Sequence, residues 1–221
     1  MNEPLRVAAH LSGLGGPLSM PEGYLHLDAL LAAAVCVRDE IPPALSASEL
    51  VPIEIPVERE PGGRFHLCSA SVSTWELAER RFTQRRFPAD LAPYMTEMQR
   101  VNLAAGAQKN FRIPLEAGRV VGDRLTWFLS GDREEVSALL SLVAYLGKRR
   151  GVGLGKVARW EIEPCLSWGE GFPIVLDGHP LRHLPPDWPG LDGPDVREGN
   201  LTYPYWLRET ETLVACPEQP C

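Results

Sequence analysis

Residues 147–156, with the sequence GKRRGVGLGK, combine the residue types that bind phosphate groups. The run holds four glycines and four cations and contains no acidic residue. Glycine lets the backbone approach a ligand closely, and lysine and arginine donate charged hydrogen bonds to phosphate oxygens. We therefore expect an anion-binding loop here, made by Gly147, Lys148, Arg149, Arg150, Gly151, Gly153, Gly155 and Lys156.

The surroundings of this loop distinguish it from two common nucleotide-binding motifs. Apolar residues recur at helical spacing over 132–146, and residues 157–163 alternate between apolar and polar as a half-buried strand does. A dinucleotide fingerprint has the opposite order, because its phosphates need the N-terminus of a following helix. A phosphate loop of the P-loop type would need serine or threonine after Lys156, where the sequence has Val157. The simpler alternative is a glycine that caps the preceding helix, next to a basic last turn.

A second basic segment spans residues 74–112, which hold seven cations against four acidic residues. Arginines lie among aromatic residues near its start, and this combination suits contacts to phosphate together with stacking on a base. The alternative is an amphipathic helix that packs Leu77 and Phe82 inward. The candidate RNA-binding residues are Arg80, Arg81, Arg85, Arg86, Lys109 and Arg112, with Phe82 and Phe87 as candidates for base stacking.

The distribution of charge supports a local anionic partner. The chain carries a net charge of −7, which argues against a coat of nucleic acid over the whole surface. Residues 1–60 hold three cations against nine acidic residues, and residues 161–221 hold three against eleven. Residues 145–160, by contrast, hold five cations and no acidic residue. Positive charge is therefore concentrated in the middle of an acidic chain.

The composition of the 221-residue chain is that of a globular protein in a reducing cytoplasm. Its five cysteines follow no disulfide framework, and none of their spacings predicts a zinc site. No apolar run reaches the roughly 18 residues of a membrane helix, and residues 1–6 do not begin a secretory signal. We therefore expect a cytoplasmic protein with no membrane contact, no metal and no cofactor.

The predicted elements follow the order strand, helix, strand (with a hairpin partner), strand, helix, strand once residues 74–121 are set aside as an insertion. This βαββαβ order is that of an α+β, ferredoxin-like (RRM-like) fold, a four-stranded antiparallel sheet with both helices on one face. We expect a domain over residues 1–165 that carries the thumb-like insertion 74–121, followed by a Pro/Gly-rich extension over 166–221. The predicted elements are strands at 5–11, 50–57, 65–72, 124–129 and 157–163, with 50–57 and 65–72 forming a hairpin, and helices at 25–37 and 132–146.

Three residues offer an alternative, catalytic interpretation. His26 and Asp28 begin the first predicted helix, and His10 lies near the end of the first strand. If these side chains converged, they would form a general acid–base pair for RNA cleavage. The alternative is that Asp28 favours the helix N-terminus electrostatically and that His26 is a surface or capping residue.

The ferredoxin-like order, with a basic glycine-rich loop between the second helix and the last strand, resembles the RAMP superfamily of CRISPR-associated proteins. The helix that begins LHLDALL at Leu25 and the loop GKRRGVGLGK together look most like the RAMP subunit of type IV effector complexes that holds the 5′ handle of the guide RNA. The resemblance covers residues 5–165 and leaves the C-terminal extension outside. In that family the inserted segment is a thumb, which would here be residues 74–112.

The resemblance implies a non-catalytic, RNA-binding subunit of a type IV CRISPR ribonucleoprotein complex. Its partners would be the crRNA and the backbone and large subunits, with target DNA engaged indirectly, in defence against or competition with foreign DNA such as plasmids. Relatives in other CRISPR types cleave repeat RNA, so a metal-independent endoribonuclease with His26 as acid or base is the first alternative. A ferredoxin-like protein that binds a nucleotide or another small anion is the second.

Overall fold

The fold is described from a computed structural model of the 221-residue chain. For 75–85 and 111–119 only the backbone is described. The described residues are 2–12, 18, 20, 23–42, 46–73, 75–85, 110–148, 154–165 and 174–217.

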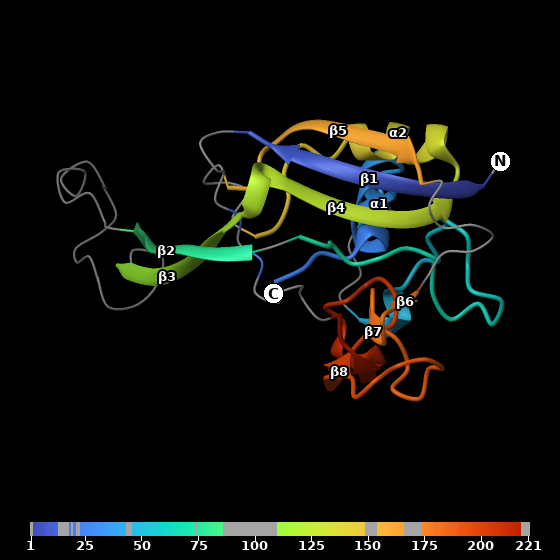
Figure 1. The fold of residues 1–221 in the computed structure, drawn as a ribbon. Helices are drawn as coiled ribbons and strands as arrows, with labels where there is room; N and C mark the ends of the chain where they lie inside the picture. The colour runs from blue at the N-terminus through green and yellow to red at the C-terminus, as the bar shows by residue number, and fades with distance from the viewer. Residues whose placement is uncertain are drawn as a thin grey trace.

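The centre of the fold is an antiparallel sheet built around the first strand (Figure 1). Strand β1 (Glu3–Leu11) pairs on one side with β4 (Arg124–Gly131) and on the other with β5 (Val157–Pro164). All three strands coincide with predicted ones. Alternation along β1 sends Leu5, Val7, Ala9 and Leu11 into the core and leaves Arg6 and His10 toward the opposite face.

Residues 67–72 occupy the position of a fourth strand beside β4. Ser69 and Val72 donate backbone hydrogen bonds to Phe128 and Thr126 at 2.8 and 2.7 Å, and isolated bridges join Cys68 to Leu129 and Val72 to Thr126. The ladder is irregular because serine hydroxyls replace some of its backbone acceptors: Phe128 N–H donates to Ser69 Oγ at 3.0 Å. The resulting order, β5-β1-β4-(67–72), is that of the predicted ferredoxin-like fold.

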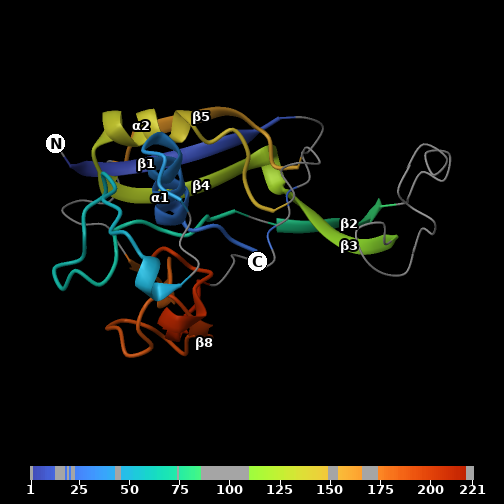
Figure 2. The same cartoon turned by 180° about the vertical axis from the view of Figure 1, so that it is seen from behind.

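Both helices cover the same face of this sheet, as the view from behind shows (Figure 2). Helix α1 (Leu27–Arg38) buries Leu31 and Val35, and α2 (Arg133–Ser141) buries Leu140. These side chains join the inward residues of the three strands in one hydrophobic core that includes Trp127. The first helix begins and ends close to its predicted limits.

The second helix is shorter than the sequence predicts. Its N-cap is confirmed, because the Asp132 side chain accepts hydrogen bonds from the backbone of Glu134 and Glu135. The helix ends at Ser141, however, and the predicted continuation to residue 146 is wrong. The chain instead turns so that Ala144 O accepts a hydrogen bond from Val157 N–H at 2.9 Å, and pairing with the start of β5 replaces helical bonds.

The prediction of a strand over residues 50–57 is also wrong, because these residues form no regular strand. Pro52 and Pro56 have no N–H to donate to a ladder, and only Val57 forms a bridge, to Gly131. The expected hairpin is confined to residues 58–67, where Leu67 N–H donates to Glu58 O at 2.6 Å. A 3₁₀ turn at Ala47–Glu49 precedes this segment.

The inserted segment is a long antiparallel hairpin that projects away from the sheet (Figure 1). Its strands are β2 (Trp75–Arg85) and β3 (Phe111–Val120), so the alternative of an amphipathic helix at its start is wrong. The chain turns at Val121–Asp123, where Gly122 has a φ of 73°.

The C-terminal extension packs below α1 (Figures 1 and 2). A small cluster of Phe65, Leu184 and Ala215 anchors it to the hairpin turn of residues 58–67. Ala70 N–H also donates to Leu181 O at 2.7 Å, which covers the outer edge of the fourth-strand segment. Its short elements are β6 (Val175–Leu176), β7 (His179–Pro180), β8 (Val196–Gly199), the 3₁₀ turn Arg208–Thr210 and β9 (Thr212–Ala215).

Candidate nucleic-acid interface

The glycine-rich loop and the inserted hairpin leave the sheet at the same end. Because β1 is antiparallel to both neighbours, its last residues lie beside the first residues of β4 and β5. The hairpin returns directly into β4 at Arg124, and the loop returns directly into β5 at Val157. The glycine-rich loop and the inserted hairpin, which carry the two basic segments of the sequence, therefore lie at the same end of the sheet.

The glycine-rich loop rests on a short paired stem. Leu146 N–H donates to Gly155 O at 2.8 Å, and Tyr145 forms an antiparallel bridge with Lys156. Ser12 N–H donates to Lys156 O at 2.8 Å and ties the stem to the end of β1. Leu146 and Leu154 are buried on either side of the loop, whereas Lys148 and Lys156 are exposed. Hydrophobic anchoring thus holds the ends of the loop while its terminal lysines face solvent.

Two of the glycines have a structural requirement that the sequence alone did not identify. Gly155 has a φ of 67°, and a Cβ atom there would lie 2.1 Å from Leu146 O, so only glycine fits beside the stem. Gly147 has a φ of 71°. It does not cap the second helix, because that helix is capped at Leu142, so the simpler interpretation of this glycine is wrong. Arg149, Arg150, Gly151 and Gly153 lie outside the described residues.

The basic residues of the insertion lie toward the distal part of the hairpin. In the register of β2 and β3, Arg80 is opposite Glu116, Arg85 is opposite Phe111, and Arg112 is opposite Gln84. Arg81 and Phe82 lie on β2 between these pairs. The remaining candidates of this segment, Arg86, Phe87 and Lys109, lie outside the described residues. The hairpin therefore carries the described candidates on two paired strands rather than on a helix.

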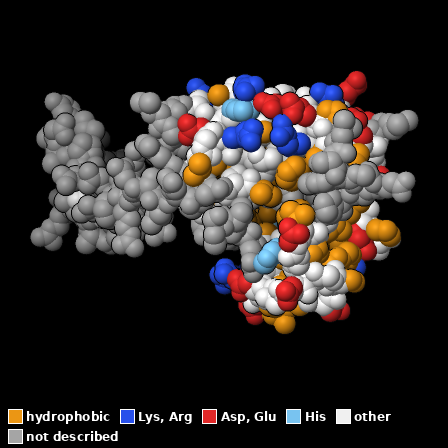
Figure 3. Space-filling model, in the orientation of Figure 1, with side chains coloured by type: hydrophobic (Ala, Val, Ile, Leu, Met, Phe, Trp, Pro, Cys, Tyr) orange, Lys and Arg blue, Asp and Glu red, His pale blue; other side chains and the backbone are white. Residues whose placement is uncertain are grey.

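A row of basic residues crosses the sheet at the same end, and His10 is the one member of it that was a candidate from the sequence. His10 on β1 is paired in register with Arg124 on β4 and with Arg159 on β5. Both arginines are exposed, and Figure 3 shows Lys/Arg side chains around a histidine on this open face of the sheet. Adjacent strands are about 4.8 Å apart, so the two arginines flank His10 across roughly 10 Å. Only the strand order reveals this row, because its members are far apart in the sequence.

Acidic residues limit how far this positive region extends along the sheet. Glu161 accepts a hydrogen bond from His10 Nε2 at 2.8 Å and lies 3.3 Å from Arg159 Nη1. The hydrogen bond from His10, followed by the charges of His10 and Arg159, lowers the pKa of Glu161. Further along β5, Glu163 pairs with Arg6 at 2.5 Å. Glu161 therefore offsets part of the positive charge of His10 and Arg159, and Glu163 offsets that of Arg6.

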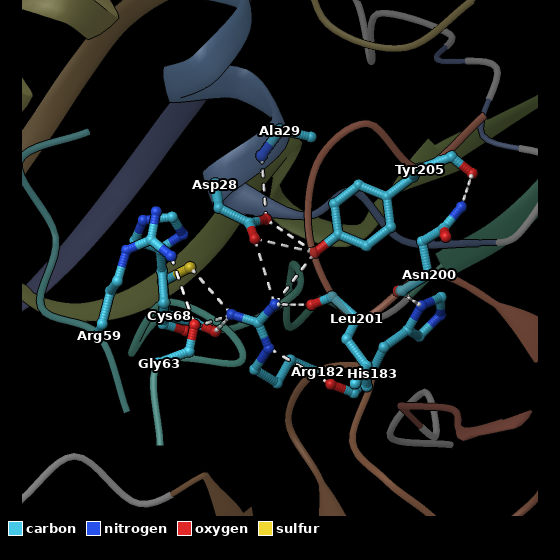
Figure 4. Close-up of polar contacts among 11 residues, drawn as sticks. Asp28, Ala29, Arg59, Gly63, Cys68, Arg182, His183, Asn200, Leu201 and Tyr205 are labelled. Atoms are coloured by element: carbon cyan, nitrogen blue, oxygen red, sulfur yellow. Dashed lines mark hydrogen bonds and ion pairs between the residues drawn. The ribbon is translucent and has the colours of Figure 1, made fainter. Parts of the chain in front are cut away.

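A second polar cluster is buried where the C-terminal extension meets α1 (Figure 4). Arg182 and Asp28 form an ion pair at 3.1 Å, with their side chains 0% and 1% exposed. Tyr205 Oη donates to Asp28 Oδ2 at 2.9 Å, and Arg182 also donates to the carbonyl oxygens of His66 and Cys68. Burial, and then the Asp28 charge, raise the pKa of Tyr205 well above 10, so it remains a donor. Every charge in the pair is thus met by hydrogen bonds, as buried ions require.

The three residues of the catalytic interpretation do not converge. His10 lies on the open face with Glu161, whereas Asp28 is held by Arg182 and Tyr205. His26 is 7% exposed and stacks on the Tyr205 ring at a centroid distance of 4.0 Å. Burial, and then the charges of His183 and Arg182, hold its pKa well below 6.5. In this arrangement His26 is a packed ring that is uncharged at neutral pH.

Other site chemistries are not supported within the described part of the chain. No cluster of three or more His, Cys, Asp or Glu side chains that could hold a metal ion occurs among the described residues. Burial raises the pKa of the Cys68 thiol to about 12, which makes it a poor nucleophile. No described helix is long and apolar enough to span a membrane.

The fold defines the class of protein: a ferredoxin-like α+β domain with a long hairpin insertion and a glycine-rich loop at one end of its sheet. A family model described as CRISPR type IV associated protein Csf3 matches residues 69–217, which is more than half of the chain. The chain therefore belongs to this CRISPR type IV associated family. A search of curated proteins finds no match.

The family match extends further toward the C-terminus than the resemblance that was found from motifs. That resemblance ended at residue 165, whereas the matched region continues to residue 217 and includes the C-terminal extension. The sequence signal in the extension is Arg182, one of three cations among eleven acidic residues in 161–221. Its importance is structural, because it joins the extension to α1 through Asp28.

Proposed function

We propose that this protein is a RAMP-type, RNA-binding subunit of a type IV CRISPR ribonucleoprotein complex and that it holds the 5′ handle of the guide RNA. In this role it acts in the cytoplasm as a non-catalytic subunit, contacts the backbone and large subunits, and engages target DNA only through the guide. Membership of the type IV family supplies the setting. What we propose beyond this membership is that the protein holds the 5′ handle, contacts the backbone and large subunits and does not catalyse RNA cleavage.

The observation that carries the proposal is the convergence of basic elements at one end of the sheet. The loop stem presents Lys148 and Lys156, the hairpin begins beside it, and Arg124 on β4 and Arg159 on β5 lie on either side of β1. Single-stranded RNA is bound through phosphate contacts from such cations, with bases stacked on aromatic side chains. Arg6, at the other end of the open face, is paired with Glu163 and offers less attraction to phosphate, and Glu161 offsets part of the charge of Arg159.

We expect the RNA to follow the loop and hairpin rather than to stack across the whole sheet face. Arg149, Arg150 and the hairpin residues Arg80, Arg81, Arg85 and Arg86 would complete the phosphate contacts. Phe82 or Phe87 would stack on a splayed base. His26, buried under Tyr205, takes no part in this arrangement, which favours binding over cleavage.

The test is a titration of the full chain with a labelled single-stranded RNA that carries the repeat-derived 5′ handle. A double Arg124→Gln/Arg159→Gln variant is compared with Arg38→Gln/Arg197→Gln, which removes the same charge from exposed positions elsewhere. The loss of two phosphate contacts with single-stranded RNA in the first variant is expected to make the slope of log K against log salt concentration shallower by about 1.4. Equal affinities and equal slopes for the two variants would show that the sheet end does not bind the handle.

A further inference from the structure

An apolar groove lies on the helix side of the fold, where α1 meets the C-terminal extension (Figure 2). Its deeper part is a cavity of about 200 Å³ between α1, residues 50–55 and residues 202–204. A shallower hollow adjoins this cavity, and the two share the lining residues Leu50, Val51, Ile53, Tyr203 and Pro204. They therefore form one continuous groove, and none of the proposed RNA-binding residues lines it.

Hydrophobic side chains are exposed along this groove. Val51 and Trp206 are each 54% exposed, and both line the shallower part. Ala32 and Ile55 are buried and line the deeper part. An engineered protein cavity of about 150 Å³ accepts benzene, so the deeper part has room for one bulky apolar side chain. Contiguous apolar surface of this kind is typical of a protein-docking site.

The surroundings of the groove are acidic. The two segments that form its walls with α1, residues 36–55 and 202–211, hold six acidic residues against two cations. Glu49 is exposed and lines the shallower part. Glu209 Oε2 accepts a hydrogen bond from Ala47 N–H at 2.7 Å, which places this carboxylate beside the turn that leads into the groove. Glu40, also exposed, directly precedes the lining residue Ile41.

The arginines near the groove offset only part of this charge. Arg38 pairs with Asp39 at 2.7 Å. Arg59, which lines the deeper part, lies 3.8 Å from Glu54 and donates to Gly63 O. Arg208 is next to Glu209 in the sequence. The rim therefore keeps an excess of carboxylates and attracts a cationic partner.

This charge distinguishes between the possible occupants of the groove. RNA phosphates would be repelled by the rim, and a second copy of the chain would bring the same carboxylates to the interface. Like charges that face each other across an interface suppress the wrong partner. A protein segment with a bulky apolar residue between lysines or arginines complements both the apolar walls and the acidic rim.

We propose that this groove docks another protein subunit of the complex through a bulky apolar side chain flanked by lysine and arginine. The proposal rests on the proposed function, because it takes a further subunit of a type IV complex as the partner. The apolar side chain packs against Ala32 and Ile55, and Val51 and Trp206 cover it. An apolar anchor within a polar rim is the usual centre of a protein interface. Protein contact then occupies the helix side, while the RNA occupies the basic end of the sheet.

The test is calorimetric titration of the full chain with the purified backbone subunit and, separately, the purified large subunit of its complex. Each titration is made with and without a bound guide RNA, and we expect at least one subunit to bind. Val51→Ser/Trp206→Ser is expected to weaken that binding at least about thirtyfold, which corresponds to the roughly 2 kcal/mol of a hot-spot residue. The control, Val196→Ser/Leu213→Ser, removes apolar side chains that are 42% and 59% exposed outside the groove, and it is expected to leave the affinity unchanged.

Charge variants test the acidic rim. Glu40→Gln/Glu209→Gln is expected to weaken subunit binding about threefold at low salt and to make its salt dependence shallower. Glu134→Gln/Glu198→Gln removes the same charge from exposed positions outside the groove and is expected to change neither quantity. Equal salt dependence of the two variants would contradict a cationic partner segment.

Photocrosslinking from the groove identifies the docked segment. Val51→p-benzoylphenylalanine is expected to crosslink the bound subunit at an apolar residue that has lysine or arginine within a few positions. A crosslinked segment without cations would overturn the proposal.

The remaining outcomes separate this proposal from the alternatives. It is overturned if neither subunit binds, or if Val51→Ser/Trp206→Ser binds as tightly as its control. It is also overturned if the groove variant loses affinity for handle RNA, or if sedimentation shows a dimer of the unmodified chain that the groove variant lacks. Failure of handle binding alone would appear in the RNA titration and would leave the subunit titration without RNA unchanged.

Discussion

Asp28, in the first turn of α1, and Arg182, in the C-terminal extension, form a buried ion pair across a sequence separation of 154 residues. This pair places the extension beside the helix and fixes His66 through its carbonyl oxygen. The extension therefore contacts the ferredoxin-like domain through buried side chains as well as at the surface.

Removal of one partner of this pair is expected to destabilise the whole chain. Arg182→Met leaves Asp28 charged in a buried site and is expected to lower the free energy of unfolding by about 3–5 kcal/mol. The double variant Asp28→Asn/Arg182→Met removes the orphaned charge and is expected to recover part of that loss. Urea unfolding measures both, with Arg197→Met at an exposed ion pair as the control. A loss in Arg182→Met no larger than in Arg197→Met would contradict the buried pair.

The two buried histidines predict a dependence of stability on pH. Burial lowers the pKa of His66 from 6.5 to about 4 and holds that of His26 well below 6.5. Between pH 6.5 and 4 the unfolded chain therefore binds protons that the folded chain does not, so the free energy of unfolding falls as pH falls. Each such histidine contributes at most about 1.4 kcal/mol per pH unit.

His66→Phe isolates this effect from the titration of the carboxylates. The variant is expected to show a shallower loss of stability over this pH range than the unmodified protein, whereas exposed His179→Gln is expected to follow the unmodified protein. Urea unfolding at half-unit pH intervals provides the comparison. Parallel curves for His66→Phe and the unmodified protein would mean that His66 titrates normally in the folded state.

Gly155 is expected to be irreplaceable in the stem of the glycine-rich loop. Gly155→Ala meets Leu146 O at 2.1 Å in addition to a positive φ, whereas Gly122→Ala meets only a positive φ of 73° with open space around it. The φ cost of about 1–2 kcal/mol is common to both variants. We therefore expect Gly155→Ala to be less stable by roughly a further 1–3 kcal/mol in urea unfolding, the usual cost of overpacking. Equal losses would show that the stem relaxes around the added methyl group.

Local sequence patterns were sufficient to predict the strands and helices that turn one face toward the hydrophobic core. Alternation predicted β1 and β4, which bury alternate residues against the two helices. It also predicted β5, whose Val157, Trp160 and Ile162 pack against the same core but are only partly buried. The end of α2 could not be predicted from its pattern, since Val143 and Leu146 keep helical spacing but pack beside the start of β5. Residues 50–57 alternate like a strand, yet their prolines cannot complete a ladder.

The site was predictable only in its local part. The loop is a contiguous run of glycines and cations, so its composition was visible. The row of Arg124, His10 and Arg159 depends on strand order, and the pairing of Asp28 with Arg182 depends on how the extension folds back. Long-range relationships of this kind leave no periodic trace in the sequence.

The most direct test of the central claim is the identity of the RNA that co-purifies with the protein from its own cells. We predict guide RNA that retains a repeat-derived 5′ handle, and we predict its loss, steeply dependent on salt, in Arg149→Ala/Arg150→Ala. The exposed pair Arg38→Ala/Arg197→Ala serves as the matched control and is expected to retain the RNA. Equal recovery of guide RNA by both variants, or its absence from the unmodified protein, would contradict the account.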